Sequence, residues 1–181
     1  MARKVPPDVR ELDIELMKCL APCVNVIPVI GRADSLTPIE LSEYKERIME
    51  DIEYHRIPVY SFPDIEEDDE ETIEENALLR RMMPFAIVSS EEVFEIGDRK
   101  VRARRYPWGM VEVDNPRHSD FLALRSALLH SHLVDLKEIT FDLLYENYRT
   151  TKLSRTMDNG GQEHNGYCFP PEISSSHKDV N

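Results

Sequence analysis

The chain has 181 residues, 41% of them hydrophobic, and a formal net charge of −13, which fits one acidic domain with a core of ordinary size. This charge excludes a general binder of nucleic acid or of anionic membranes, because both partners are negative. Three cysteines without a secretory signal indicate a reducing intracellular setting, and no apolar run reaches the about 20 residues of a membrane span.

The first third of the chain predicts alternating helices and strands. Leucines at four-residue spacing predict an amphipathic helix over Arg10–Leu20, and the β-branched run Val24–Ile30 predicts a buried strand. The run Thr37-Pro38-Ile39-Glu40 has the residues of a capping box, so we expect a helix to begin there. A second strand is predicted over Ile57–Phe62. This order indicates an α/β fold with a parallel sheet.

The middle of the chain predicts a loop and then a set of strands. Nine of the twelve residues over Asp64–Glu75 are acidic, which predicts a solvated loop leading into a short helix. A strand is expected over Phe85–Val88. Val93–Ile96 and Lys100–Tyr106 predict a β-hairpin, which Met110–Val113 extends.

The last part of the chain predicts two helices and a tail. One helix is expected from Ser119 or Asp120 through about His130, and the other covers about Leu133–Tyr148. Residues 154–181 are polar and contain paired glycines and prolines, so we expect a disordered tail there.

The motif with chemical content is Gly31-Arg32-Ala33-Asp34, which ends the first predicted strand directly before a helix. Ligands of α/β sheets bind at the carboxyl ends of strands. The P-loop GTPases carry Asn/Thr-Lys-x-Asp at this place, and the aspartate accepts hydrogen bonds from N1 and N2 of guanine. Adenine offers no such donor pair, so a carboxylate selects guanine. The four residues alone leave a second interpretation open, in which Asp34 only leads into the helix.

Longer stretches resemble one family. Leu12–Lys18 and Val24–Thr37 are similar to LDIEFMK and VNVIPVIAKADTLT of the septins, and Val101–Val113 resembles the septin unique element, VRGRxYPWGxxEV. Tyr145–Arg149, Tyr-Glu-Asn-Tyr-Arg, follows at the expected distance. The likeness covers about 10–153 in the right order, and the chain is identified by it as a member of the septin family.

The resemblance implies a fold and a domain organisation. We expect the C-terminal part of a septin GTPase domain over 10–153, with the septin unique element over about 92–153. The fold class is α/β, a partial P-loop GTPase-like three-layer sheet to which the unique element adds a β-hairpin or meander and helices. Residues 1–9 lie outside the likeness.

The resemblance also implies a guanine-binding site for GTP or GDP. Asp34 pairs with the guanine edge, and Arg32 stands where the family has a lysine that covers the ring, an exchange that is not neutral. Ser89 stands where septins have a glycine against the base, so a side chain enters a close approach. Arg104 matches the arginine that lies over the nucleotide.

Two residues are implied at a subunit contact formed across that site, namely Trp108 and His118. The residues alone leave Trp108 equally a core anchor or an interface hot spot. The last helix, about Leu133–Arg149, matches the helix of the other subunit contact, although it must also pack on its own sheet. The expected partners are other septin subunits in a homo- or hetero-oligomer of the cytoplasmic cytoskeleton, at the septin ring of the division site. Neither nucleic acid nor direct membrane binding is expected.

The phosphate side of the site is missing from the 181 residues. They contain no Gly-x-x-x-x-Gly-Lys-Ser/Thr sequence, which supplies the phosphate cradle and a hydroxyl for Mg²⁺. We therefore expect a shortened septin of marginal stability that acts mainly in assembly, binds GTP weakly or not at all, and has neither Mg²⁺ ligands nor catalytic residues. The alternatives are an active GTPase completed by a partner chain and a non-functional remnant.

Overall fold

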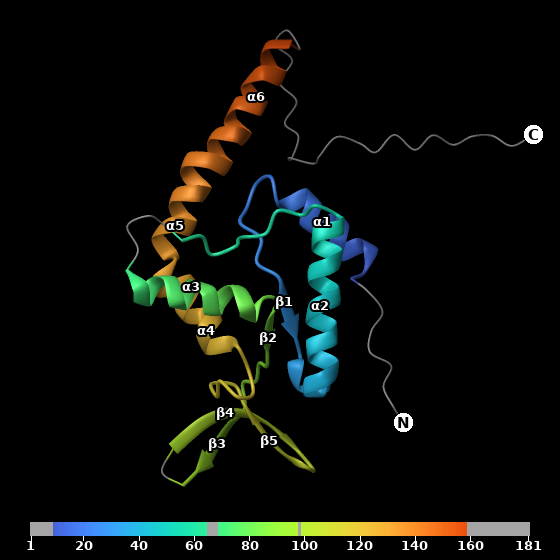
Figure 1. Ribbon diagram of the computed structural model, residues 1–181, viewed down its shortest axis with the longest axis vertical. Helices are drawn as coiled ribbons and strands as arrows, with labels where there is room; N and C mark the ends of the chain where they lie inside the picture. The colour runs from blue at the N-terminus through green and yellow to red at the C-terminus, as the bar shows by residue number, and fades with distance from the viewer. Residues whose placement is uncertain (1–8, 65–68, 98, 159–181) are drawn as a thin grey trace, which may run out of the picture.

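The computed structural model describes residues 9–64, 69–97 and 99–158, and of 155–158 the backbone alone (Figure 1). In chain order the elements are α1 (Glu11–Leu20), β1 (Val29–Gly31), η1 (Ala33–Ser35), α2 (Pro38–Tyr54), α3 (Glu70–Met82), β2 (Phe85–Ile87), β3 (Val93–Ile96), β4 (Arg99–Tyr106), β5 (Gly109–Glu112), α4 (Phe121–Ser126), η2 (Ala127–Ser131), α5 (Leu133–Glu138), η3 (Ile139–Tyr145) and α6 (Glu146–Asp158). None of these helices is long and apolar enough to cross a membrane.

Two short parallel strands form the centre of the molecule. Ile30 of β1 lies opposite Ala86 of β2, and the N–H of Phe85 donates to the carbonyl of Pro28 at 3.2 Å. Strands were predicted at both places and are confirmed, although β1 begins only after Pro28. Proline has no N–H to donate, so it marks the end of the ladder.

The outer edge of β2 is closed by a turn of the chain. The N–H of Asp120 donates to the carbonyl of Ala86 at 2.8 Å, and the Asp120 carboxylate accepts the N–H of the same residue at 2.8 Å. One step further, the N–H of Val88 donates to Oγ of Ser119 at 3.0 Å. The side chain and backbone of this turn thus take the place of a neighbouring strand and leave these β2 groups satisfied.

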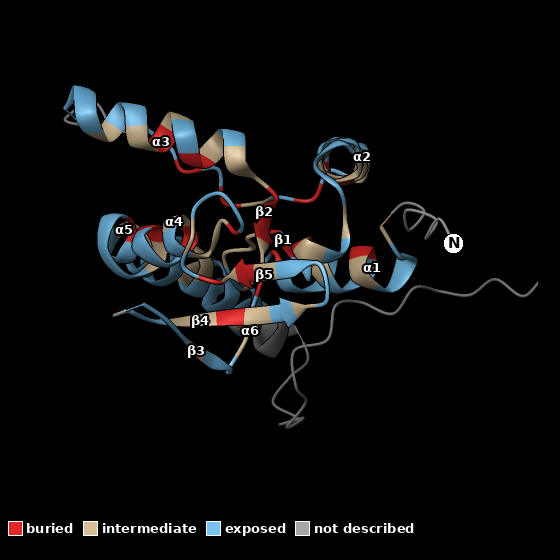
Figure 2. Cartoon of the chain, turned by 90° about the horizontal axis from the view of Figure 1, so that it is seen from below, coloured by how far each residue is buried: buried red, intermediate tan, exposed pale blue. Residues whose placement is uncertain are grey.

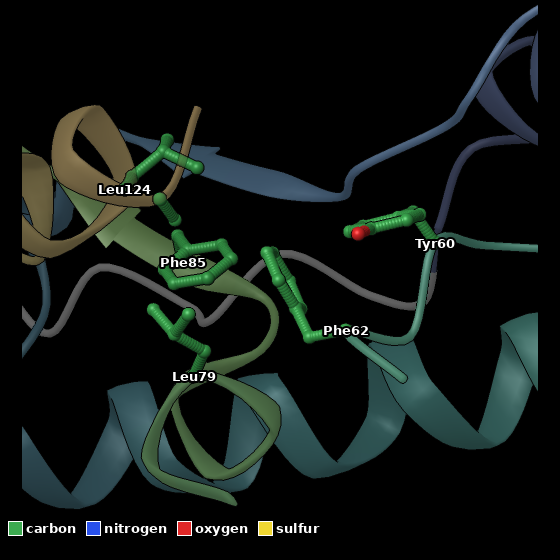
Figure 3. Packing of buried hydrophobic residues seen from close by; sticks show 6 residues of the cluster. Tyr60, Phe62, Leu79, Phe85 and Leu124 are labelled. Atoms are coloured by element: carbon green, nitrogen blue, oxygen red, sulfur yellow. The ribbon is translucent and has the colours of Figure 1, made fainter. Parts of the chain in front are cut away.

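Helices cover both faces of the β1–β2 sheet. On one face Ile30 packs with Ile14 of α1 and with Ile48 and Ile52 of α2. On the other face a cluster around Phe85 is formed by Tyr60, Phe62, Leu79, Leu124 and Ala127 (Figure 3). The α/β class with helix, sheet and helix layers is therefore confirmed.

The aromatic rings of that second cluster meet edge to face. The centroids of Phe62 and Phe85 are 5.8 Å apart at 80°, and those of Tyr60 and Phe62 are 4.9 Å apart at 75°. Phe62 and Phe85 are both 0% exposed. This arrangement favours the ring quadrupoles as well as burial of the ring area.

The strand predicted over Ile57–Phe62 is wrong. The segment is extended but has no strand pairing in the described part of the chain, although the N–H of Tyr60 donates to the carbonyl of Val26 at 2.8 Å. Pro58 and Pro63 have no N–H to contribute to a ladder, and Phe62 has a left-handed backbone (φ 48°). The apolar pattern was correct for burial, since Ile57, Tyr60 and Phe62 are all buried, but not for strand pairing.

Helix α2 begins as its sequence predicts. Oγ1 of Thr37 accepts the N–H of Glu40 at 3.3 Å, and the Glu40 carboxylate accepts the N–H of Thr37 at 2.8 Å, with Pro38 in the first turn. This backbone hydrogen bond from Thr37 lowers the pKa of Glu40. Two of the free N–H groups at the helix start are thereby satisfied.

The predicted hairpin and its extension are confirmed as the antiparallel sheet β3–β4–β5, which lies at the opposite end of the molecule from α6 (Figure 1). Tyr106 pairs with Gly109, so β4 and β5 are joined by the two-residue turn Pro107-Trp108. Gly97, between β3 and β4, has a φ of +61°, which a residue without Cβ adopts without strain.

The second of the two predicted C-terminal helices is longer than expected. The first predicted helix is confirmed as α4 followed by the wider π-helical turns of η2, and the second begins at Leu133 as expected. Helical backbone then continues through η3 and α6 to Asp158, ten residues past the predicted end at Tyr148. It thereby enters the segment for which disorder was expected, of which 159–181 lie outside the described residues.

Helix α1 presents an unexpected side to solvent. Its existence is confirmed, but Leu12 and Leu16 are 73% and 54% exposed, whereas Ile14 and Met17 pack against β1 and α2. Figure 2 shows α1 mostly in the colour of exposed residues. The helix therefore has apolar side chains on two sides, and only one of them is covered within the described part of the chain.

Candidate functional site

The candidate site begins at the turn that follows β1. Arg32 has a left-handed backbone (φ 57°), and its carbonyl accepts both the N–H and Oγ–H of Ser35, at 2.9 and 2.8 Å. The single 3₁₀ turn η1 that follows carries Asp34. Ala33 is buried beside Ala86 and Val88 at the end of β2, which fixes the turn on the sheet.

Asp34 lies against β4 of the other sheet. Nη1 of Arg104 is 3.2 Å from Oδ1 of Asp34, and the hydroxyl of Tyr106 donates to Oδ2. The Asp34 side chain is only 1% exposed, so both oxygens are enclosed by these partners. Two of the predicted site residues, Asp34 and Arg104, are thus brought together across 70 positions of sequence.

Tyr106 is a member of this cluster that the sequence reasoning missed. Its hydrogen bond to Asp34 raises the pKa of the phenol, with burial adding to the shift, while the nearby guanidinium groups of Arg104 and Arg32 oppose it. The Arg104 guanidinium lies 5.7 Å from the ring centroid of Tyr106. A signal was available, because residues two apart in a strand share a face, so a strand that directs Arg104 at Asp34 also directs Tyr106.

Arg32 and Ser89 lie beside this cluster without joining it. Both are exposed, Arg32 directly after β1 and Ser89 two residues after β2. Because β1 and β2 are parallel and in register, the two residues leave the sheet at the same edge. Among the residues that the structure describes, neither of these two side chains forms a hydrogen bond or an ion pair with Asp34, whose partners are Arg104 and Tyr106.

A cavity of about 910 Å³ opens next to the turn, between α1, β1 and α2. Its lining includes Gly31, Arg32, Ser35 and Thr37 but not Asp34, whose side chain turns toward β4. An apolar part of its lining is formed by Met17, Ile30, Tyr44, Ile48 and Ile52. The volume is in the range of small-molecule sites.

The described residues offer no metal site, since no three His, Cys, Asp or Glu side chains among them are grouped as ligands. The groups that meet at Asp34 can form hydrogen bonds and an ion pair. A carboxylate with a guanidinium and a phenol around it can receive donors from a ligand, provided that the present donors move.

The predicted interface residues lie on the same side of the molecule as β4 and β5. Trp108 is 71% exposed in the β4–β5 turn, and its ring stacks on that of Tyr106 with centroids 4.8 Å apart at 6°. This exposure excludes the core-anchor interpretation. His118 is also exposed, and its Nδ1 accepts the N–H of Glu112 at 3.1 Å, which leaves the proton of the neutral ring on Nε2.

Comparison with known proteins decides the family. The family model described as Septin matches residues 5–162. The chain belongs to the septin family. The septin homolog spn3 of Schizosaccharomyces pombe is 63% identical over 149 residues, which are 82% of this chain and 40% of that protein. Septation protein 7 of Candida albicans is 44% identical over 168 residues, 83% of this chain and 25% of that protein.

The fold comparison agrees with the septin assignment. A crystal structure of a septin GTPase domain from Chlamydomonas reinhardtii matches with a TM-score of 0.61 at 27% identity, over 80% of this chain and 55% of that one. This septin chain thus spans less than half of the two curated relatives and about half of the crystallised domain.

Proposed function

We propose that this septin chain is a subunit of cytoskeletal filaments at the site of cell division. Its sequence relatives support this role, since one of them is named as a septation protein. The partners are other septin subunits, of the same or another kind. The cytoplasmic location follows from that partnership.

The second part of the proposal is a guanine-nucleotide site of which these residues form the base side. Asp34 receives the N1–H and N2–H groups of guanine, Arg104 and Arg32 lie over the ring system, and Ser89 borders the base. The observation that carries this proposal is the 3.2 Å contact of Asp34 with Arg104, which lie 70 positions apart in the sequence. A septin GTPase domain among the matching structures supports the ligand class.

GTP and GDP are expected to bind weakly to the 181 residues. No P-loop sequence occurs in them, so charge-assisted contacts to the phosphates have no local source. The base contacts remain, and they alone favour guanine over adenine. The chain is therefore proposed to act mainly through assembly.

Assembly is proposed to use the exposed face of the β4–β5 turn. Trp108 is a large aromatic side chain with 71% exposure, and such residues are the most frequent hot spots of interfaces. His118 lies after β5 with Nε2–H available as a donor. Arg104 and Trp108 lie on one hairpin, so a subunit seated here would also border the nucleotide.

The test of assembly is size-exclusion chromatography with light scattering on the chain, with and without GDP. Trp108→Ala is expected to convert an oligomer to a monomer, because truncation of a central aromatic residue typically weakens binding by about 2 kcal/mol or more. Tyr54→Ala is the matched control, since Tyr54 is 81% exposed on α2, away from that hairpin. A monomer in the wild type, or an equal loss in both variants, refutes the interface.

The test of the site is binding of GDP by isothermal titration calorimetry. We expect weak binding that Asp34→Asn abolishes, because an amide presents a donor to one of the two guanine donors. ADP serves as the matched ligand. Equal affinity for GDP and ADP, or GDP binding unaffected by Asp34→Asn, contradicts the base-reading role.

A further inference from the structure

The carboxylate of Asp34 is enclosed by side chains of its own chain. Oδ1 faces the Arg104 guanidinium, and Oδ2 accepts a hydrogen bond from the Tyr106 hydroxyl. The Asp34 side chain is only 1% exposed to solvent. A guanine that approaches through two adjacent donors needs both oxygens in one plane. In this arrangement the base therefore has no open path to the carboxylate unless Tyr106 and Arg104 move aside.

Tyr106 connects the enclosed carboxylate to the surface. Its hydroxyl holds Asp34, while its ring stacks on Trp108 at 4.8 Å and 6°. Trp108 occupies a two-residue turn and is 71% exposed, and among the described residues its aromatic partner is Tyr106. The position of the exposed indole thus depends on a ring that is itself positioned by Asp34.

We propose that Asp34, Arg104 and Tyr106 form a latch that closes the base-reading carboxylate and at the same time holds Trp108 in place. A guanine base that takes the two oxygens of Asp34 releases the phenol of Tyr106, and with it the indole of Trp108. This inference rests on the proposed guanine site for its ligand. The link between Asp34 and Trp108 rests on the contacts of the chain alone.

The cost of opening the latch follows from the kind of bond that is broken. A hydrogen bond to a charged group is stronger than one between neutral groups, and the raised pKa of Tyr106 reflects the same bond from the side of the phenol. Removal of the hydroxyl in Tyr106→Phe leaves Oδ2 free for the ligand. We therefore expect Tyr106→Phe to bind GDP about tenfold more tightly than the wild type.

The indole provides an internal probe, because Trp108 is the only tryptophan of the chain. Steady-state anisotropy of its fluorescence reports how firmly the ring is held. We expect Asp34→Ala to lower this anisotropy without any nucleotide, and Tyr106→Phe to lower it as well although the aromatic ring for stacking remains. GDP is expected to produce the same loss in the wild type.

Two controls keep the experiment decisive. Tyr54→Phe removes an exposed hydroxyl from α2. The ring of Tyr54 contacts His55 and not the latch, so this variant is expected to change neither the anisotropy of Trp108 nor the GDP affinity. Far-UV circular dichroism of each variant shows that the fold persists, and Tyr106→Phe is the milder variant should Asp34→Ala unfold.

The outcomes separate the latch from the guanine site. Unchanged anisotropy in folded Asp34→Ala and Tyr106→Phe overturns the latch, whatever GDP does. If Tyr106→Phe binds GDP more tightly and has a reduced anisotropy, both the latch and the guanine site are supported. If Tyr106→Phe binds GDP more weakly, the phenol assists base binding and its role in closing the site is overturned. If no variant binds GDP but Asp34→Ala still lowers the anisotropy, the guanine site fails and the link from Asp34 to Trp108 is supported.

Discussion

The replacement Asp120→Ala tests how the edge of β2 is held. The Asp120 carboxylate accepts the N–H of Ala86 at 2.8 Å and lies 3.0 Å from Nζ of Lys45, which also donates to the carbonyl of Met82 at 2.7 Å. One carboxylate thereby joins α2 to β2 and to the turn before α4. Alanine removes the acceptor and leaves a strand N–H and an ammonium with fewer partners.

The magnitude follows from the burial of these groups. The side chains of Lys45 and Asp120 are 21% and 18% exposed, so the ion pair is screened more than a fully buried one. A hydrogen bond to a charged group contributes about 1.5–3 kcal/mol. We expect Asp120→Ala to lower the free energy of unfolding by about 2–3 kcal/mol. Asp120→Asn retains an oxygen for Ala86 and should cost about 1 kcal/mol.

The assay is urea denaturation followed by far-UV circular dichroism. Asp114→Ala is the matched control, because Asp114 forms a 2.7 Å pair with Arg102 whose side chains are 42% and 41% exposed, and such pairs contribute about 0–1 kcal/mol. An equal effect of Asp120→Ala and Asp114→Ala would refute the reasoning. So would equal effects of the alanine and asparagine variants at 120, because the acceptor for Ala86 would then be irrelevant.

Three further predictions concern the core, a helix start and alkaline pH. Phe62→Ala removes a ring that is 0% exposed and should lower the free energy of unfolding by about 3–5 kcal/mol in urea, far more than Tyr54→Ala. Thr37→Ala removes the cap of α2 and should cost about 1 kcal/mol in the same assay, while Thr37→Ser should cost less than half of that. Burial, with the charge of Asp135, raises the pKa of Tyr60 from 10 to about 12, so the folded state favours the neutral phenol. The contribution of the neutral Tyr60 phenol to the free energy of unfolding is complete below pH 10 and is lost as pH rises through 12. Between these pH values Tyr60→Phe should lose less stability than the wild type. Parallel curves of unfolding free energy against pH for the two proteins would contradict the assignment.

Local patterns carried most of what the sequence predicted correctly. The capping box at Thr37 and the hairpin of β3 and β4 are each formed by segments that are neighbours in sequence, so local patterns suffice to predict them. The strand expected at Ile57–Phe62 failed because burial and strand pairing share the same apolar signal. Pairing also needs donors, and the prolines in and after this segment lack them.

Contacts between distant parts of the chain were harder to foresee. Asp34 and Arg104 were assigned from the septin likeness. The bond from Tyr106 to Asp34 spans 72 positions, and the strand periodicity points to it only once Arg104 has been placed against Asp34. Helix α1 presents a similar difficulty. Leu12 and Leu16 form the more regular stripe, yet Ile14 and Met17 pack against the core, because the neighbouring elements decide which side is covered.

The geometry of the latch is set by packing beneath it. Ala33 of η1, Val88 after β2 and Val111 of β5 are 5%, 0% and 8% exposed and form one cluster with Ala86, which joins both sheets to the turn that carries Asp34. Small apolar side chains at close range leave little room for the turn to shift relative to β4 and β5. The Asp34–Tyr106 bond therefore joins parts that are already held in place. Its removal is expected to free Trp108 without unfolding the site. A change of Trp108 anisotropy in Tyr106→Phe can therefore be attributed to the lost bond and not to a loss of structure.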